Sequence, residues 1–155
     1  MTCIDAGAIS GKCADERNIW AFMFPEEFRQ VEPSSMELIA VIEKGLPGSA
    51  IGKMAEMFDV NKAQIYSLLH LKPKTAQRAS AKSSLSVDTS DHIVQILKIY
   101  EHCLDVFGSN EKTSRWLTTP NHALGGELPI HLMDTMEGIS LINDTVTRIE
   151  YGVFA

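Results

Sequence analysis

The sequence predicts an all-α fold, and three observations support this prediction. No segment alternates apolar and polar residues over more than a few positions, as a half-buried strand would. Apolar residues instead recur at helical spacing, and glycine, proline and capping residues divide the chain into helical segments. The clearest apolar stripe consists of Ile93, Ile96, Leu97, Tyr100, Leu104 and Phe107. A chain of 155 residues can form one compact unit or two small helical modules that share a core.

Residues 1–33 are expected to form an N-terminal arm that packs on its own domain or on a dimer partner. A short helix is predicted over residues 25–31, because Glu26 and Glu27 suit the first turn of a helix. The arm also contains an apolar and aromatic cluster that consists of Ile19, Trp20, Phe22, Met23, Phe24 and Phe28.

Residues 34–87 are expected to form a module of four short helices and a linker. Ser34 or Ser35 caps the first helix and Gly45 ends it, while Pro73 marks the start of the last one. The four helices are predicted over residues 34–44, 49–58, about 61–71 (with 59 as an alternative start) and 73–81. Residues 82–87 form the linker.

Residues 88–155 are expected to form a second module, which the chain enters through its longest helix. That helix is predicted over residues 91–107, with Ser90 as its N-cap and Gly108 as its end. We interpret it as a strut that joins the two modules. A shorter helix follows it and ends at Leu117.

Proline and glycine divide the next part of the chain. A turn is predicted at residues 118–121, where Pro120 fixes its own φ, and a second break at residues 125–126. A helix is predicted to begin at Pro129, whose missing N–H is no loss in a first turn, and to stop at Gly138.

A last helix is predicted from residue 140, with an apolar face of helical period, and Gly152 is predicted to end it in a left-handed turn. Val153, Phe154 and Ala155 follow as an apolar tail with a free carboxylate. Two alternatives are open for this tail. Either Phe154 is presented to a partner, or it folds back on the core of its own chain.

The charge distribution indicates two different partner surfaces. A net charge of −6 argues against a protein that coats nucleic acid indiscriminately. Residues 61–82 nevertheless contain basic side chains and no acidic ones. The basic residues are Lys62, Lys72, Lys74, Arg78 and Lys82. Such a block suggests one anionic partner, and the alternative interpretation is a solvated lysine-rich face.

Short helices joined by tight turns, one of them basic, predict a helix-turn-helix, and two frames are possible. The first pairs the helix ending at Phe58 with the one starting at Asn61. It exposes Lys62, Gln64 and Ser67. The second pairs residues 62–69 with residues 73–81. Its outer helix offers the candidate DNA-binding residues Lys72, Lys74, Thr75, Gln77 and Arg78. Arginine can pair with guanine, glutamine with adenine, and lysine and threonine with phosphate.

The residues predict no enzyme, metal site or cofactor. The five histidines are scattered over different elements, and nothing assembles a nucleophile, a base and an oxyanion donor. The odd set of Cys3, Cys13 and Cys103 has no metal-ligand spacing, so reduced thiols in a cytoplasm are the simplest account. Cys103 is expected to be buried and inert. The sequence also shows no secretory signal and no membrane span, so a cytoplasmic location is expected.

The C-terminal residues carry a family resemblance. The pattern consists, in order, of Trp116-Leu117, Pro120-Asn121, Ala123-Leu124-Gly125-Gly126, Pro129, Gly138, Arg148-Ile149 and Tyr151-Gly152-Val153-Phe154. This pattern resembles the toxin-binding domain of the Xre/MbcA/ParS antitoxins. The resemblance implies a type II antitoxin, with an N-terminal DNA-binding module and a C-terminal domain that blocks a RES-domain toxin. RES toxins of this family degrade NAD. The candidate toxin-binding residues are Arg148, Tyr151, Gly152, Val153, Phe154 and Ala155.

The resemblance also favours the second helix-turn-helix frame. Antitoxins of this group commonly have a threonine and two arginines in the outer helix, followed by a linker and a Ser-Asp helix start. The matching residues are Thr75, Arg78, Ser90 and Asp91. Gln77 stands where the first arginine is usual, and Tyr66 and His70 replace the small residues that such a turn prefers.

Three hypotheses for function follow. The first is an antitoxin that binds both a RES-domain toxin and its own operator DNA. The second is a transcriptional regulator whose C-terminal domain only dimerises or senses a ligand, and the third is a small hydrolase or transferase. A homodimer is expected, because two-fold operators need two-fold readers. Its candidate interfaces are the cluster of Trp20, Phe22 and Phe24 and the stripe in residues 91–107.

Overall fold

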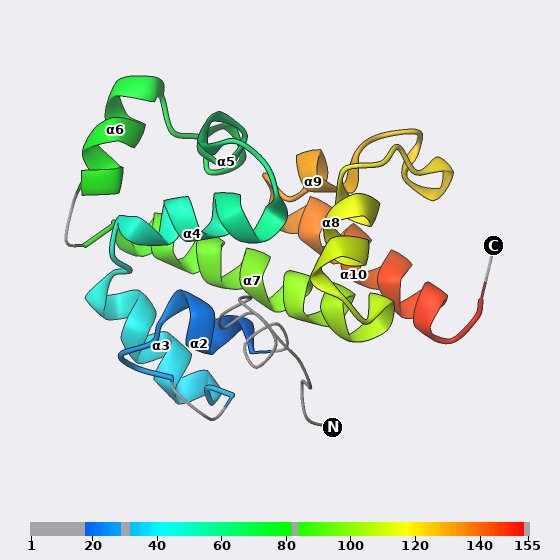
Figure 1. Cartoon of the computed structure of the whole chain (residues 1–155), viewed down its shortest axis with the longest axis horizontal. Helices are drawn as coiled ribbons and strands as arrows, with labels where there is room; N and C mark the ends of the chain where they lie inside the picture. Colours follow the sequence, from blue (N-terminus) through cyan, green and yellow to red (C-terminus); the bar gives the residue numbers. More distant parts are fainter. Residues whose placement is uncertain (1–17, 29–31, 82–83, 154–155) are drawn as a thin grey trace, which may run out of the picture.

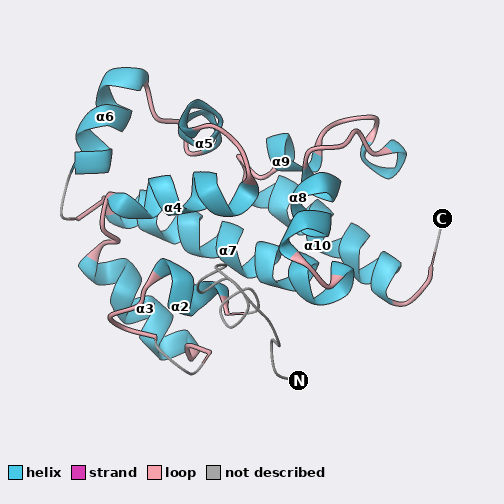
Figure 2. Ribbon diagram, in the orientation of Figure 1, coloured by secondary structure: helices cyan, strands magenta, loops and turns pink. Residues whose placement is uncertain are grey.

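The computed structural model describes residues 18–28, 32–81 and 84–153, and in these ranges it contains helices and loops without strands (Figure 2). The predicted all-α fold is therefore confirmed. Figure 1 shows that the helices gather around α7 (Val87–Phe107), which runs through the middle of the molecule. The inner face of α7 includes Ile93, Ile96, Leu97 and Tyr100, all of them fully buried.

The longest helix begins earlier than the sequence predicts. Ser86 is its N-cap and accepts a hydrogen bond from the backbone N–H of Thr89 at 3.2 Å. Ser90, the predicted cap, lies inside the helix and is buried. Its Oγ accepts a hydrogen bond from the backbone N–H of Leu46 at 2.9 Å. Ser90 therefore satisfies a buried donor of a distant loop instead of capping its own helix.

The four short helices of the first module lie close to their predicted positions. They are α3 (Ser35–Lys44), α4 (Ser49–Phe58), α5 (Lys62–Leu68) and α6 (Pro73–Ala81). Capping boxes fix the N-terminal ends of α3 and α5. In α3 the side chains of Ser34 and Glu37 each accept a hydrogen bond from the other residue's backbone N–H, and in α5 Asn61 and Gln64 do the same. The C-cap of α4, Asp59, has a left-handed backbone, and so does His70, which follows the C-cap of α5, Leu69.

The second module contains α8 (Asn110–Leu117), the 3-10 turn η1 (His122–Leu124), α9 (Pro129–Leu132) and α10 (Met136–Glu150). The predicted single helix from Pro129 to Gly138 is wrong. The chain turns after Leu132, and Thr135 caps α10 by accepting a hydrogen bond from the N–H of Gly138 at 3.0 Å. Gly138 lies within the first turn of α10. A Cβ atom there would overlap the carbonyl oxygen of Leu132, so glycine permits the tight approach of α9 and α10.

The N-terminal part described begins with α2 (Ile19–Met23). The predicted helix over residues 25–31 is wrong in its described part, because residues 25–27 form a turn, while residues 29–31 lie outside the described ranges. Trp20 and Phe24 are buried within the chain, and the Nε1–H of Trp20 donates to Glu101 of α7 at 3.0 Å. The apolar cluster therefore packs on its own domain. Trp20, Phe24 and the stripe of α7 as far as Leu104 are buried within the chain and so cannot form a dimer interface, whereas Phe22 and Phe107 are half-buried.

The two modules share one core through a polar cluster around the carbonyl oxygen of Met57, near the end of α4. This oxygen accepts hydrogen bonds from the Tyr100 hydroxyl at 3.1 Å and from Asn110 Nδ2 and Ser114 Oγ, each at 3.3 Å. Tyr100 also hydrogen-bonds to the Asn110 side-chain oxygen and stacks on Phe58, with ring centroids 4.7 Å apart. Helix α4 is thus tied to both α7 and α8.

The partial burial of the Glu101 carboxyl should make the stability of the protein depend on pH. Partial burial raises the pKa of the Glu101 carboxyl above its ordinary value, although the hydrogen bond from Trp20 opposes this rise. A raised folded-state pKa means that the folded protein holds the proton at pH values where the unfolded chain releases it. The free energy of unfolding therefore falls as pH rises through the range just above the ordinary carboxyl pKa.

Glu101→Gln should be more stable than the wild type at neutral pH and should lose this part of the pH dependence. Glutamine keeps the oxygen that accepts from Trp20 but carries no charge to desolvate. Urea unfolding at about pH 5 and about pH 7.5 measures both effects. Asp91→Asn, which removes an exposed carboxylate of the same helix that does not act on Glu101, is the control. Equal slopes for wild type and Glu101→Gln would contradict the prediction.

Candidate functional site

Helix α6 presents an exposed polar and basic face. Ala76 and Ala79 are its buried residues, and they pack the helix against the module. The candidate DNA-binding residues Lys72, Lys74, Thr75, Gln77 and Arg78 are all exposed. Lys74 and Arg78 are four residues apart and therefore lie on one face of the helix. Neither is paired with a carboxylate in the described ranges.

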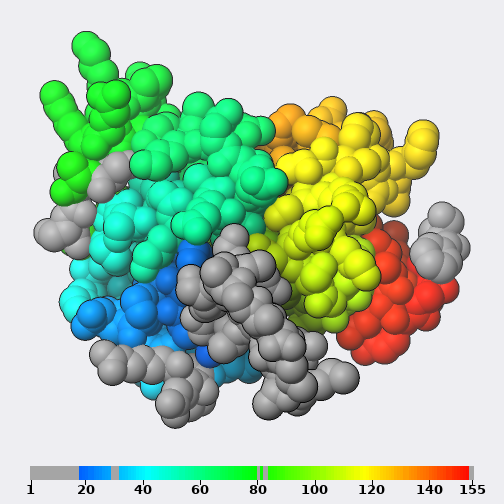
Figure 3. Space-filling model, viewed as in Figure 1, coloured from blue at the N-terminus to red at the C-terminus, as the bar shows by residue number. Residues whose placement is uncertain are grey.

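The space-filling view shows α6, in green, projecting from the body of the molecule (Figure 3). Helix α5 also exposes Lys62, Gln64 and Ser67. Its Gln64 and Ser67 line a groove of about 300 Å³, whose other wall is formed by Ile130, His131 and Asp134 of the second module. Gln64 is also held in its capping box with Asn61. The outer residues of both frames are therefore exposed, but the first frame offers a single basic side chain, Lys62, whereas the second offers Lys72, Lys74 and Arg78.

Helix α10 ends in an exposed apolar segment. The backbone N–H of Gly152 donates to Ile149, and that of Val153 donates to Arg148, while Gly152 has φ 67°. This is a Schellman motif, and it confirms the predicted left-handed end of the helix. Tyr151 is 74% exposed and Val153 is 57% exposed. Phe154 and Ala155 lie outside the described residues.

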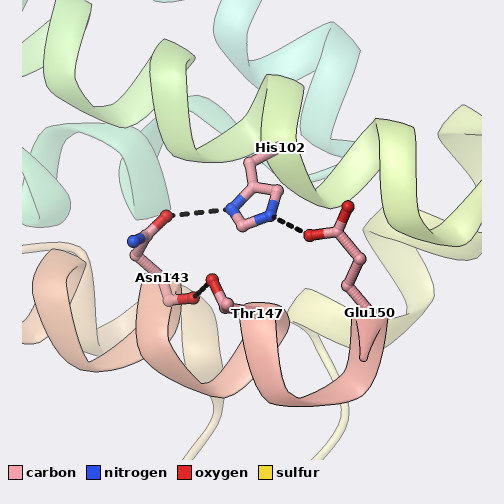
Figure 4. A network of polar contacts seen from close by, with 4 residues as sticks. All are labelled: His102, Asn143, Thr147 and Glu150. Carbon is pink, nitrogen blue, oxygen red and sulfur yellow. Dashed lines mark hydrogen bonds and ion pairs between the residues drawn. The ribbon is translucent and has the colours of Figure 1, made fainter. Parts of the chain in front are cut away.

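A polar network holds the last turns of α10 against α7 (Figure 4). His102 of α7 lies between two side chains of α10, with Nδ1 2.9 Å from the Asn143 side-chain oxygen and Nε2 3.2 Å from Glu150 Oε2. The Thr147 hydroxyl donates to the backbone carbonyl of Asn143 at 2.8 Å. This network fixes the direction in which α10 points its exposed end. No local sequence pattern predicts this network, because the histidine lies 41 residues from Asn143.

The Pro-Asn and Gly-Gly elements form one closed loop. The backbone N–H of Asn121 donates to Glu127, its carbonyl accepts from Gly126, and its side chain accepts from Ala123. Gly125 and Gly126 both have positive φ, which lets the chain reverse over a few residues. The loop follows α8, where Trp116 packs on Phe107 with ring centroids 5.1 Å apart.

The two sets of candidate residues lie far apart. Helix α6 is at one end of the molecule, whereas the end of α10 is at the opposite end (Figure 1). Cys103 is buried, as predicted, and burial raises the pKa of its thiol to about 12, which disfavours the reactive thiolate. Within the described ranges, His, Cys, Asp and Glu form no group of three that could hold a metal ion. No helix of the described chain is long and apolar enough to cross a membrane.

Comparison with known proteins matches both modules. Residues 37–98 match the Antitoxin Xre-like helix-turn-helix domain, and residues 104–152 match the Antitoxin Xre/MbcA/ParS C-terminal toxin-binding domain. A Prs ADP-ribosylating antitoxin of Sphingobium sp. is 30% identical over 132 residues, which cover 79% of this chain and 83% of that protein. The chain belongs to the Xre antitoxin family. An Antitoxin Xre of Photorhabdus laumondii is 26% identical and an Antitoxin Xre of Yersinia enterocolitica is 24% identical, over 77% and 76% of this chain and 82% and 81% of those proteins.

Membership of the Xre family establishes a type II antitoxin with a helix-turn-helix DNA-binding domain. The family consists of antitoxins and not of enzymes, which confirms the prediction that the chain has no catalytic role. The match to the helix-turn-helix domain ends at residue 98, and the match to the toxin-binding domain begins at residue 104. Both limits fall inside α7, so the first part of this helix belongs to one domain of the Xre antitoxin and its last part to the other.

Proposed function

We propose that this Xre antitoxin neutralises a RES-domain, NAD-degrading toxin with the end of α10 and the tail that follows it. The proposal is carried by the exposed end of α10, which His102 connects to α7. Tyr151 and Val153 expose apolar surface there, and the Schellman turn directs the chain away from the helix axis. Arg148, on the last full turn, is exposed beside them. An aromatic anchor such as Phe154, buried in a cleft, is the kind of contact that dominates protein interfaces.

The name of the Sphingobium relative supports a second candidate for the toxin's chemistry. That protein is a Prs ADP-ribosylating antitoxin. ADP-ribosylation and NAD degradation both break the bond between nicotinamide and ribose, so one blocking tail suits either reaction. The neighbouring toxin, purified alone and with the antitoxin, distinguishes them. Loss of NAD without labelled protein supports degradation, whereas transfer of labelled ADP-ribose to a protein supports the second candidate.

We also propose that the antitoxin represses its own promoter as a homodimer that reads DNA with α6. The exposed residues of α6, with its alanines buried beneath them, support the second helix-turn-helix frame. The first frame is less favoured because α5 has a single basic residue, Lys62. A single reading helix contacts few base pairs, so a pair of chains is needed for a two-fold operator. The exposed apolar residues Met36 and Ile39 of α3 are candidates for the contact between the chains.

Arg78→Ala should weaken operator binding by about 1–3 kcal/mol and relax sequence preference, if Arg78 reads a base. Lys74→Ala should weaken binding on all sequences alike, because a phosphate contact carries no sequence information. The measurement is a gel-shift titration on the promoter upstream of the gene, at two salt concentrations, with the number of bound chains determined by light scattering. Lys62→Ala on α5 is the control.

Unchanged affinity in both α6 variants, with a loss in Lys62→Ala, would contradict the second frame and support the first. A complex that contains one chain per operator would contradict the homodimer.

A further inference from the structure

Three hydrogen bonds join the loop between α3 and α4 to the segment that follows α6. The Ser84 hydroxyl donates to the backbone carbonyl oxygen of Lys44 at 3.0 Å, and the backbone N–H of Leu85 donates to the carbonyl oxygen of Leu46 at 2.7 Å. The N–H of Leu46 in turn donates to the Ser90 hydroxyl. Lys44 is the last residue of α3, so Ser84 satisfies a carbonyl group that the helix leaves without an internal partner. We refer to these three contacts as the linker clamp.

Glycine at position 45 permits this close contact. Gly45 has φ 88°, in the left-handed region where glycine is favoured. A Cβ atom there would overlap both the Ser84 hydroxyl and the backbone carbonyl oxygen of Leu85. Leu46 and Leu85, whose backbones the clamp joins, are both buried. The clamp therefore requires a residue without a side chain at position 45, because of its backbone conformation and because of the space.

Helix α6 is held on its module by small side chains. It packs on α4 and α5 at the edge of the molecule (Figure 1). Among its described side chains the buried ones are Ala76 and Ala79, which bury less apolar surface than the isoleucines and leucines of α7. The helix ends at Ala81, and Ser84 follows three residues later. Three residues span at most about 11 Å, so a fixed Ser84 limits how far the end of α6 can move.

We propose that Gly45 and Ser84 are positioning residues for DNA binding, because the linker clamp sets the direction in which α6 presents its basic face. The inference rests on the proposed function, since it assumes that α6 reads the operator. Base contacts specify the sequence and depend on accurate placement of the reading helix, whereas phosphate contacts are made alike on every sequence. Loss of the clamp should therefore weaken binding to the operator more than binding to unrelated DNA.

The experiment compares two clamp variants with two controls. Ser84→Ala removes one bond of the clamp, and Gly45→Ala forces the two segments apart. Ser86→Ala removes a hydroxyl of the same segment that caps α7 instead, and Gly108→Ala places alanine at the same φ of 88° with no atom within 4 Å of its Cβ. In the free antitoxin, amide hydrogen exchange in residues 77–81 should be about two- to tenfold faster in Ser84→Ala, the factor that one hydrogen bond of ordinary strength represents.

Gel-shift titrations on the operator and on unrelated DNA give the specificity ratio of each variant. This ratio should fall about fivefold or more in Gly45→Ala, since two hydrogen bonds of the clamp are lost there. It should stay near the wild-type value in Gly108→Ala and in Ser86→Ala. Ser84→Thr, which keeps the hydroxyl, should restore the wild-type exchange of residues 77–81.

Unchanged exchange in residues 77–81 of both clamp variants would overturn the inference even if the proposed function holds. Faster exchange throughout the module, with equal losses on operator and unrelated DNA, would also overturn it, because the clamp would then only stabilise the fold. Faster exchange confined to α6, with an unchanged specificity ratio, would instead refute the proposal that α6 reads the operator.

Discussion

Deletion of Val153, Phe154 and Ala155 should abolish neutralisation of the toxin and leave the antitoxin folded. Val153 is 57% exposed, so its removal takes away little apolar packing, although it also removes one of the two hydrogen bonds of the Schellman turn, the bond from the Val153 N–H to Arg148. If the tail occupies the toxin's cleft, its loss removes the aromatic anchor, and hot-spot anchors of this kind are worth about 2–4 kcal/mol or more. Growth rescue and the NAD content of cells that express the toxin measure the effect.

Val87→Ser is the matched control for this deletion. Val87 is 51% exposed and lies at the opposite end of the molecule, so its substitution removes similar apolar surface away from the tail. Full neutralisation by the truncated protein would show that the tail does not block the toxin, and the surface of residues 116–136 would then be responsible. A large loss of stability on truncation would show that Phe154 packs on its own core.

Gly138→Ala should destabilise the protein by about 2–3 kcal/mol, against the ordinary preference for alanine in a helix. The new Cβ would overlap the Leu132 carbonyl oxygen and lie close to the Thr135 hydroxyl that caps α10. Because the overlapping atom belongs to the backbone, α9 and α10 must separate to admit the methyl group. Thermal or urea unfolding measures the loss, and weaker neutralisation should accompany it.

Gly52→Ala provides the control for that substitution. Gly52 is also helical, but a Cβ there would meet only the flexible end of the Lys62 side chain, at ordinary contact distance. This variant should be unchanged or more stable by up to about 1 kcal/mol. If Gly138→Ala behaved in the same way, the close approach of α9 and α10 would not be the reason for glycine at position 138.

Local signals predicted most of the helices. The capping boxes at Ser34 and Asn61, the proline at position 73 and the glycine at position 108 each act within a few residues, and the predicted bounds near them are correct to within a residue or two. The exposed face of α6 and the turn at Gly152 were predicted for the same reason, because helical period and glycine φ are local properties.

The errors concern residues whose roles depend on distant parts of the chain. Serine is a common N-cap residue, but the hydroxyl of Ser90 accepts a hydrogen bond from the backbone N–H of Leu46, 44 residues away. Glycine commonly ends a helix, but Gly138 lies inside α10, where the close approach of the Leu132 carbonyl oxygen leaves no room for a Cβ atom. His70 is visible in the sequence as an unusual residue for its turn. Its Nε2 lies 2.7 Å from the carbonyl oxygen of Asp134, 64 residues away, and no local pattern predicts that contact.

Helix α7 also limits how this family can diversify. One side of it carries Tyr100, which binds α4, while His102 on another side binds α10. Recombination that joined the DNA-reading half of one relative to the toxin-binding half of another would divide this helix and mismatch the surfaces packed on it. Under the proposal that α6 reads the operator and the end of α10 binds the toxin, new pairings are therefore expected to arise by single substitutions in these two regions. Both regions are exposed, so they can change without disturbing the core that the two halves share.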